Sequence, residues 1–97
     1  MVLQIVTLKS DLPEDELLKR AKERENNFKS ISGLLQKYYV KTSKDGEYGG
    51  VYIWDSLQSL KNYQESELAK SIPSAYAIND MPNIEIMDIL FQLKDSQ

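Results

Sequence analysis

Two strand-like runs joined by an Asp-Gly pair constrain this chain more than any other feature. The runs cover residues 34–42 and 47–55, and Asp45-Gly46 lies between them. Asp-Gly is a favoured pair for a tight turn between antiparallel strands, so the sequence predicts a β-hairpin here. The runs are rich in aromatic residues, and Gly49-Gly50 leaves space where larger side chains would normally fill the sheet surface. A pocket for a small molecule is therefore the first functional hypothesis.

The segments before the hairpin add one strand and one helix. Residues 2–9 are rich in Val, Ile and Leu, which favours a strand covered on both faces. A helix is expected to follow, with Asp11 as its N-cap, Pro13 near its first position and an end near Asn26. Acidic residues 14–16 fall in its first turn, where carboxylates interact favourably with the helix dipole. We therefore assign this acidic cluster to the helix and expect no metal site.

The segments after the hairpin again give a helix and then a strand. Asp55 or Ser56 is the expected N-cap of the second helix, and Pro73 ends or bends its continuation. The last strand is expected over residues 84–93. The order strand-helix-strand-strand-helix-strand predicts an α+β, ferredoxin-like βαββαβ fold with a four-stranded antiparallel sheet. A short extra helix or irregular segment is expected near residues 67–78.

The first and last strands carry apolar residues on both faces. Helices would cover only one face of this sheet, so the second apolar face needs another cover. An identical sheet from another subunit, related by a two-fold axis, is the simplest one, and we expect a homodimer closed sheet to sheet. The residues concerned are Val2, Leu3, Ile5 and Val6 in the first strand and Ile84, Ile86, Met87, Ile89, Leu90 and Phe91 in the last.

Length and charge exclude several classes of protein. The chain has 97 residues, 41% of them hydrophobic, enough for one core and too few for two, so residues 1–97 are expected to form a single domain. Its net charge is -3 and its basic residues are interspersed with acidic ones, which argues against a nucleic-acid partner. The N-terminal run lacks a basic leader, and no apolar run approaches the roughly 20 residues of a membrane span. A cytoplasmic protein with no membrane partner is expected.

The sequence contains no Cys and no His. This excludes disulfides, thiolate nucleophiles, imidazole bases, the usual zinc ligand sets and haem held by an axial His or Cys. Catalysis would have to use carboxylates, Lys, Tyr, Ser, Thr or amides, or a borrowed cofactor. We assign no bound cofactor and no metal to the chain.

Aromatic residues are the expected walls of the pocket. Parity places Tyr38 on one face with Gly50 and Tyr52, although the unknown hairpin loop leaves the register of the two strands open by one residue. Flat molecules stack on such walls. The same aromatics would also serve as core or dimer interface, and the two roles are compatible. The expected pocket residues are Tyr38, Gly50, Tyr52, Trp54, Tyr63 and Tyr76, with Tyr39 as a further aromatic candidate.

Three residues are candidates for catalysis. Asp88 interrupts an apolar strand, so it is either a proton acceptor with a raised pKa or a rim carboxylate paired with Lys37 or Lys41. Asn62 lies beside Tyr63 on the second helix, and either hydrogen-bonds a substrate oxygen or is an ordinary exposed polar residue. The Tyr63 hydroxyl is the third candidate.

The element order and three segments resemble a known group. The segments are Gly33-Leu34-Leu35 at the entry to the second strand, residues 49–55 (Gly-Gly-Val-Tyr-Ile-Trp-Asp) that lead from the third strand into a helix, and Tyr63. Over about residues 2–93 the chain resembles the antibiotic biosynthesis monooxygenase (ABM) superfamily of dimeric α/β barrels, and within it the YdhR-like branch of monooxygenases. The resemblance implies the fold and leaves the reaction open, because this superfamily hosts several chemistries.

The resemblance also separates two chemistries of the superfamily. Haem-degrading relatives use an Asn, a Trp and a His that fall near Thr7, Tyr63 and Pro73 of this chain, and none of the three is kept. Quinone-forming relatives oxidise polycyclic phenols with molecular oxygen and no cofactor. Their reaction needs a substrate that becomes a carbanion, a group that accepts its proton, and a dry chamber.

Two hypotheses of different classes follow. The first is a cofactor-independent monooxygenase acting on a small aromatic or hydrophobic molecule. The second is a non-catalytic dimeric module of the same fold, a small-ligand binder or stress-related protein whose aromatics mainly pack. A deep chamber with a polar group pointing into it favours the first, and an interior filled by side chains favours the second.

Overall fold

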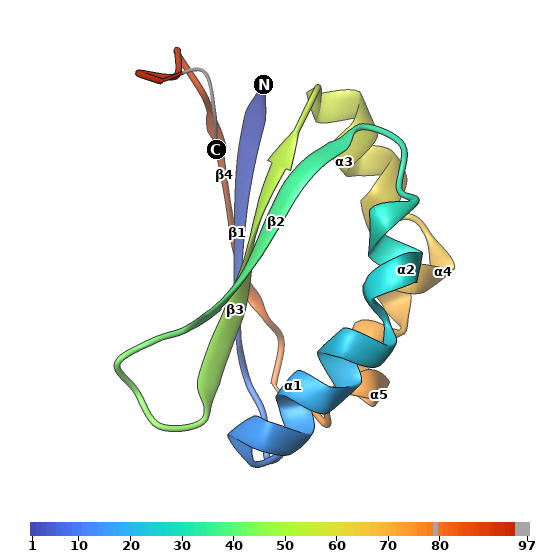
Figure 1. The fold of residues 1–97 in the computed structure, drawn as a ribbon, viewed down its shortest axis with the longest axis vertical. Helices are drawn as coiled ribbons and strands as arrows, with labels where there is room; N and C mark the ends of the chain where they lie inside the picture. Colours follow the sequence, from blue (N-terminus) through green and yellow to red (C-terminus); the bar gives the residue numbers. More distant parts are fainter. Residues whose placement is uncertain (79, 95–97) are drawn as a thin grey trace.

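Within the described residues, four strands form one antiparallel sheet (Figure 1). Two helices connect the first strand to the second, and three connect the third strand to the fourth. The structure, a computed structural model, describes residues 1–78 and 80–94. The strands, in the sheet order β2-β3-β1-β4, are β1 (Val2–Lys9), β2 (Leu34–Lys41), β3 (Glu47–Trp54) and β4 (Asn83–Asp88). The helices are α1 (Glu14–Glu23), α2 (Glu25–Lys29), α3 (Leu57–Gln64), α4 (Glu67–Lys70) and α5 (Ile72–Ala75). The expected α+β, ferredoxin-like fold is confirmed.

All five helices lie on the same side of the sheet in Figure 1. Residues 2, 4 and 6 of β1 face this helical layer, and Val2 and Gln4 are buried there. On the opposite face, no helix of the described residues covers the sheet. The register places Ile5 beside Val51, and Leu3 beside Ile53 and Met87, on that open face. The sheet therefore has a second apolar face, opposite the helices, to which β1 contributes Leu3 and Ile5.

The core beneath the helices is aromatic. Trp54 and Leu60 are fully buried, and the Trp54 ring lies 6.0 Å from that of Tyr52 and 5.3 Å from that of Tyr63. The indole Nε1 of Trp54 donates a 3.0 Å hydrogen bond to Oε1 of Gln4, whose amide is also buried. This bond satisfies both polar groups where water does not reach.

Glycine supports two turns next to the hairpin strands. Gly46 has a φ of +73° in the β2–β3 connection, which confirms the predicted turn at Asp45-Gly46. Gly33 has a φ of +84°, and its carbonyl accepts the backbone N–H of Asp55 at 2.8 Å. A Cβ at Gly33 would lie 2.2 Å from Oγ of Ser59, so both the backbone angle and the contact require glycine there.

The N-cap of α3 is a residue predicted from the sequence, and the N-cap of α1 is not. Ser56 is the N-cap of α3, and its Oγ accepts the N–H of Ser59, as expected. Pro13, and not Asp11, occupies the N-cap position of α1, so the predicted Asp11 cap is wrong. The proline fixes an extended conformation (φ −61°, ψ 154°) immediately before the first helical residue.

The last strand is shorter than the expected 84–93, because its partner ends. β4 pairs only with β1, and the register joins Asp88 to Val2, the first residue of β1. One further backbone bond joins the N–H of Ile89 to the carbonyl of Met1. Beyond it Phe91 is 77% exposed. The predicted strand over residues 89–93 is therefore wrong, although the apolar pattern continues.

Candidate functional site

A small apolar cavity lies between the helical face of the sheet and helices α1 and α5. Its volume is about 40 Å³, and we call it the inner cavity. Aliphatic side chains, four tyrosines, one lysine and two glycines line it: Val6, Leu8, Leu17, Ala21, Ile72, Tyr39, Tyr48, Tyr52, Tyr76, Lys37, Gly49 and Gly50. Tyr39, 42% exposed, connects this lining to the surface. Gly50, Tyr52 and Tyr76 thus lie where the sequence analysis expected a pocket.

Lys37 is the only charged side chain in this lining. Its Nζ lies 3.5 Å from the ring centroid of Phe28, 4.3 Å from that of Tyr39 and 4.6 Å from that of Tyr52. Within residues 1–78 and 80–94, no carboxylate forms an ion pair with this amine and no group hydrogen-bonds it. The amine is therefore surrounded by aromatic rings beside an apolar space.

Burial and a nearby cation change the protonation of Lys37. Burial lowers its pKa from 10.5 to about 7, and the positive charge of Arg24 acts in the same direction. Arg24 belongs to the same cluster, because its Cζ lies 5.9 Å from the Phe28 ring and 5.7 Å from the Tyr76 ring. A lysine in this setting exchanges a proton near neutral pH, as a general base must.

Gly49 and Gly50 are adjacent, but glycine is needed at the two positions for different structural reasons. A Cβ at Gly49 would lie 2.4 Å from the backbone oxygen of Val6, so β1 leaves no space there. A Cβ at Gly50 would lie 3.0 Å from Cε1 of Tyr52 and 3.3 Å from Cε of Lys37. Gly50 therefore provides the room that the lysine chain and the tyrosine ring occupy. The expected free space exists, but neighbouring side chains fill most of it.

The register of the hairpin corrects one expected pocket residue. Tyr39, and not Tyr38, pairs with Gly50, while Tyr38 pairs with Val51. Paired residues of adjacent strands face the same side, so Tyr38 lies on the open face and Tyr39 and Lys37 face the helices. The prediction that Tyr38 and Gly50 share a face is therefore wrong. An odd-numbered residue of β2 shares its face with an even-numbered residue of β3, which parity within each strand does not reveal.

Two tyrosine hydroxyls, those of Tyr63 and Tyr76, are buried and make no hydrogen bond of good geometry among the described residues. Tyr52 lies near the first hydroxyl and Arg24 near the second. Burial raises the pKa of both phenols above the ordinary value. Burial also raises the pKa of Tyr52, and that of Tyr39 to about 12. All four phenols stay protonated at neutral pH and are able to donate a hydrogen bond to a ligand oxygen.

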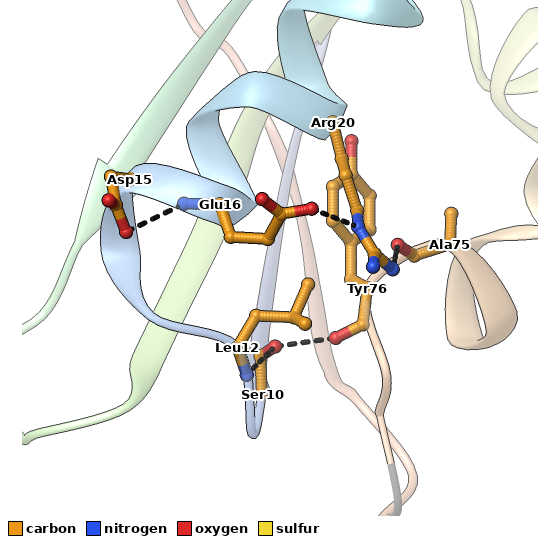
Figure 2. A network of polar contacts seen from close by, with 7 residues as sticks. All are labelled: Ser10, Leu12, Asp15, Glu16, Arg20, Ala75 and Tyr76. Atoms are coloured by element: carbon orange, nitrogen blue, oxygen red, sulfur yellow. Dashed lines mark hydrogen bonds and ion pairs between the residues drawn. The ribbon is translucent and has the colours of Figure 1, made fainter.

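A polar network holds Tyr76 in place (Figure 2). Oγ of Ser10 donates to the carbonyl of Tyr76 and accepts the backbone N–H of Leu12. Arg20, which also pairs with Glu16 at 3.2 Å, donates to the carbonyl of Ala75 at 3.0 Å. The end of β1 and helix α1 thus fix the backbone on either side of the Ala75–Tyr76 bond. The Tyr76 ring is positioned by contacts far from it in sequence.

Tyr63 lines a second space, which we call the outer groove. The groove has a volume of about 260 Å³, lies between β4 and helices α3 to α5, and includes Gln4, Gln64, Pro73 and Ile84. It shares Val6, Tyr52 and Ile72 with the inner cavity, so these three side chains separate the two spaces. Trp54 lines neither space, because its ring is fully buried in the core.

The two polar candidates other than Tyr63 lie away from the inner cavity. Asp88 is exposed at the end of the edge strand β4. Neither proposed partner reaches it, because Lys41 forms a 2.8 Å ion pair with Glu14 and Lys37 is surrounded by rings. Asn62 is exposed on α3 and accepts a 2.9 Å hydrogen bond from Gln58. Neither residue borders the Lys37 amine.

Lys37 was missed as a candidate site residue because it was considered only as a surface partner of Asp88. The signal in the sequence was a lysine directly before two tyrosines, on the strand that pairs with the Gly49-Gly50 strand. The described residues contain no group of three or more acidic side chains suited to a metal ion. No helix among them has the length and apolar character needed to cross a bilayer.

Several solved structures share this fold, and some of them are described as antibiotic biosynthesis monooxygenases. A putative antibiotic biosynthesis monooxygenase from Deinococcus radiodurans is similar with a TM-score of 0.73, 14% identity and 100% of both chains covered. SnoaB, described as a cofactor-independent oxygenase from Streptomyces nogalater, is similar with a TM-score of 0.75, 11% identity and 97% of both chains covered. A protein of unknown function from Nitrosomonas europaea has a TM-score of 0.77 and 15% identity over 99% of this chain and 95% of its own.

The family assignment rests on the sequence. The profile of the family described as "Putative mono-oxygenase ydhR" matches residues 2–93, almost the whole chain. The chain therefore belongs to this mono-oxygenase family, and the resemblance noted in its sequence is confirmed. Among curated proteins, no relative matches the chain.

Proposed function

We propose that the chain is a cofactor-independent monooxygenase that oxidises a small aromatic or hydrophobic molecule beside Lys37. The observation that carries the proposal is the Lys37 amine, surrounded by aromatic rings and unpaired with any described carboxylate, in the lining of an apolar cavity. Burial there lowers its pKa to about 7. The family supports oxygenation, and the similarity to SnoaB supports a reaction without a cofactor. We expect a substrate that carries an acidic O–H or C–H bond. The site offers a base that removes such a proton, and the electrons for O2 then come from the substrate.

In the proposed reaction Lys37 accepts the proton that activates the substrate. The neutral amine removes it, and the resulting carbanion or phenolate gives electrons to O2. A bond forms between one substrate carbon and one oxygen atom, and the Lys37 ammonium returns its proton to the resulting peroxide anion, giving a hydroperoxide and the neutral amine. The O–O bond then breaks as the second hydrogen leaves the same carbon, so one oxygen atom stays in the product as a carbonyl. The other oxygen leaves as water, which carries the proton from Lys37 and the second hydrogen.

The phenols around the amine would hold the developing anion. Tyr76 lines the inner cavity and its hydroxyl makes no hydrogen bond of good geometry among the described residues. A donor aimed at a phenolate oxygen stabilises the charge that forms during deprotonation. Lys37 becomes a cation in the same step, so the anion forms beside a positive charge. A low-dielectric lining makes both interactions stronger than in water.

We also propose that the protein works as a homodimer closed through the open face of its sheet. The support is an apolar surface that no described helix covers, with Ile5 beside Val51 and Tyr38 next to Val51 in the register. Burying such a surface against its own copy forms a symmetric, self-complementary interface. Tyr38 then belongs to the interface and not to the pocket.

A non-catalytic ligand binder of the same fold is the second candidate, and the size of the inner cavity favours it. Small-molecule sites usually enclose about 300–1,000 Å³, whereas the inner cavity has about 40 Å³. A polycycle would enter only if the ring of Tyr39 or Tyr52 moved. If these rings stay fixed, the site accepts only very small molecules.

Oxygen uptake with a panel of reactive phenols tests the proposal. We expect turnover by the wild-type protein and a loss of about 10²- to 10⁴-fold in Lys37→Met, the range for removal of a general base. Lys41→Met, on the same strand and exposed, is the matched control and should keep the rate. Ligand binding without oxygen uptake would refute the oxygenase proposal in favour of the ligand binder. Equal oxygen-uptake rates in Lys37→Met and Lys41→Met would show that Lys37 is not the base.

A further inference from the structure

We infer that the Lys37 side chain captures small aldehydes covalently, as a Schiff base in the inner cavity. This activity is separate from oxygenation and needs neither O2 nor an oxidisable substrate. It uses three features of the site together: an amine with no anionic partner, a small apolar space beside it, and aromatic rings on several sides.

The amine is both accessible and free to react. No described hydrogen bond or ion pair occupies Nζ of Lys37, whereas Lys41 pairs with Glu14 at 2.8 Å and Lys29 pairs with Glu25 at 3.5 Å. Tyr39 lines the cavity and is 42% exposed, so the lining reaches the protein surface there. A nucleophilic lysine must be unprotonated, and burial beside another cation is a known way to keep it so. Here Arg24 is that cation.

The cavity selects for size. A volume of about 40 Å³ with an apolar lining holds a carbonyl group with a short alkyl chain, and it admits a fused ring system only if the ring of Tyr39 or Tyr52 moves. Leu17, Ala21 and Ile72 supply apolar contacts for the chain. Gly50 keeps this space open beside the lysine, because a Cβ there would lie 3.3 Å from Cε of Lys37. A short aliphatic aldehyde is therefore the ligand class that fits.

The reaction balances without an oxidant or reductant. The nitrogen lone pair of Lys37 attacks the carbonyl carbon, a C–N bond forms, and a proton passes from nitrogen to the carbonyl oxygen. The carbinolamine then takes up a proton and loses its hydroxyl group as water while a C=N bond forms. One water leaves for each imine formed. The phenols of Tyr39 and Tyr52 stay protonated at neutral pH, and their ring centroids lie 4.3 and 4.6 Å from Nζ.

The aromatic rings favour the product cation. A protonated imine spreads its charge over carbon and nitrogen, so it is less strongly hydrated than an ammonium group. The rings of Phe28, Tyr39 and Tyr52 lie within 3.5–4.6 Å of Nζ, close enough for cation–π attraction to whichever cation forms there. Burial therefore costs the strongly hydrated ammonium more free energy than it costs the protonated imine. The same surroundings thus lower the pKa of the free amine and favour its protonated Schiff base over the ammonium.

Reductive trapping with propanal tests this inference. The protein is incubated at neutral pH, without oxidisable substrate, with limiting propanal and cyanoborohydride, and each lysine is then quantified by peptide mass spectrometry. We expect Lys37 to be alkylated at least about 10-fold faster than Lys41, because a much larger fraction of it is unprotonated at that pH. A bulky aldehyde such as naphthaldehyde should lose this preference. Lys37→Arg should remove the fast phase, and Lys41→Arg should keep it.

Even labelling of all lysines, or equal preference for propanal and naphthaldehyde, would overturn the inference. Both readouts use the wild-type protein, so the test stands even if Lys37→Arg does not fold. Loss of the size preference alone leaves the oxygenase proposal in place, whereas even labelling of all lysines would also remove the deprotonated Lys37 on which that proposal depends. Absence of oxygen uptake likewise leaves the Schiff base untouched.

Discussion

Replacing Lys37 by Met should stabilise the protein at neutral and acidic pH. The side chain of Met has a similar length and no charge, so it fills the same channel between the rings of Phe28, Tyr39 and Tyr52. The wild-type pKa of about 7 lies below the ordinary value of 10.5, so between these pH values the unfolded chain binds the lysine proton and the folded chain does not. Wild-type stability therefore rises with pH across that window, and below pH 7 the buried ammonium costs its full penalty.

The size of the gain follows from opposing effects on the ammonium. Each pKa unit corresponds to about 1.4 kcal/mol, which sets an upper bound of about 5 kcal/mol for a fall from 10.5 to about 7. Each ring face returns about 0.5–1 kcal/mol to the cation, and the half-buried side chain can move towards water. We expect Lys37→Met to gain about 1–3 kcal/mol near pH 6 and to lose the advantage near pH 10.5.

Urea unfolding at fixed protein concentration, repeated from about pH 6 to pH 10.5, measures this directly. The free energy of unfolding of the wild-type protein should rise through the window, and the curve of Lys37→Met should lack that rise. Lys41→Met is the control, because an exposed lysine paired with Glu14 should leave the pH dependence in place. A Lys37→Met variant that is less stable at every pH, or one that keeps the wild-type slope, would refute the buried, titrating lysine.

Three further substitutions test other parts of the structure. Gln4→Met removes the acceptor of the Trp54 indole and should cost about 1–3 kcal/mol in urea unfolding followed by tryptophan fluorescence; an unchanged midpoint would contradict the buried bond. Gly33→Ala should cost about 2 kcal/mol or more by the same measurement, since φ is +84° and Ser59 blocks the added Cβ; wild-type stability would show that the turn is different. Ile5→Lys should convert a dimer to a monomer by light scattering, and an unchanged mass would move the interface elsewhere.

Local chemistry was enough to predict the elements of this fold. The turn at Asp45-Gly46 and the cap at Ser56 follow from the conformations those residues favour, and both are confirmed. The order of elements then leaves few ways to arrange a four-stranded sheet with helices on one side. Whether the chain forms a single domain, and whether it forms a dimer, stay predictions.

The errors arose where one strand depends on another. The apolar pattern of the C-terminal segment continues to Leu93, but β1 begins at Val2, so nothing remains to pair with residues beyond Ile89. Strand length is therefore set by the partner as well as by the sequence of the strand itself. In the same way, the face of Tyr38 depended on how β2 is aligned with β3.

The alignment of β2 is set by features that alternation of side chains does not encode. A register irregularity lies between Leu34 and Gln36, and the hairpin connection pairs Lys41 with Tyr48. Together they decide which parity of β2 faces the helices. A one-residue change would turn every side chain of the strand to the other face.

This dependence explains why the candidate site was recognised in outline and missed at its centre. Gly50, Tyr52 and Tyr76 were assigned to the pocket from residue type and, for the first two, from parity along the strand, and they line the inner cavity. Lys37 was not, because a lysine on an exposed strand is normally a solvated residue and only the register brings it opposite Tyr52. Once it faces the helices, the missing side chain at Gly50 gives its methylene groups a place to lie. The reactive amine is thus produced by the pairing of two strands, and a change that shifted their register would expose it to water and return it to an ordinary lysine.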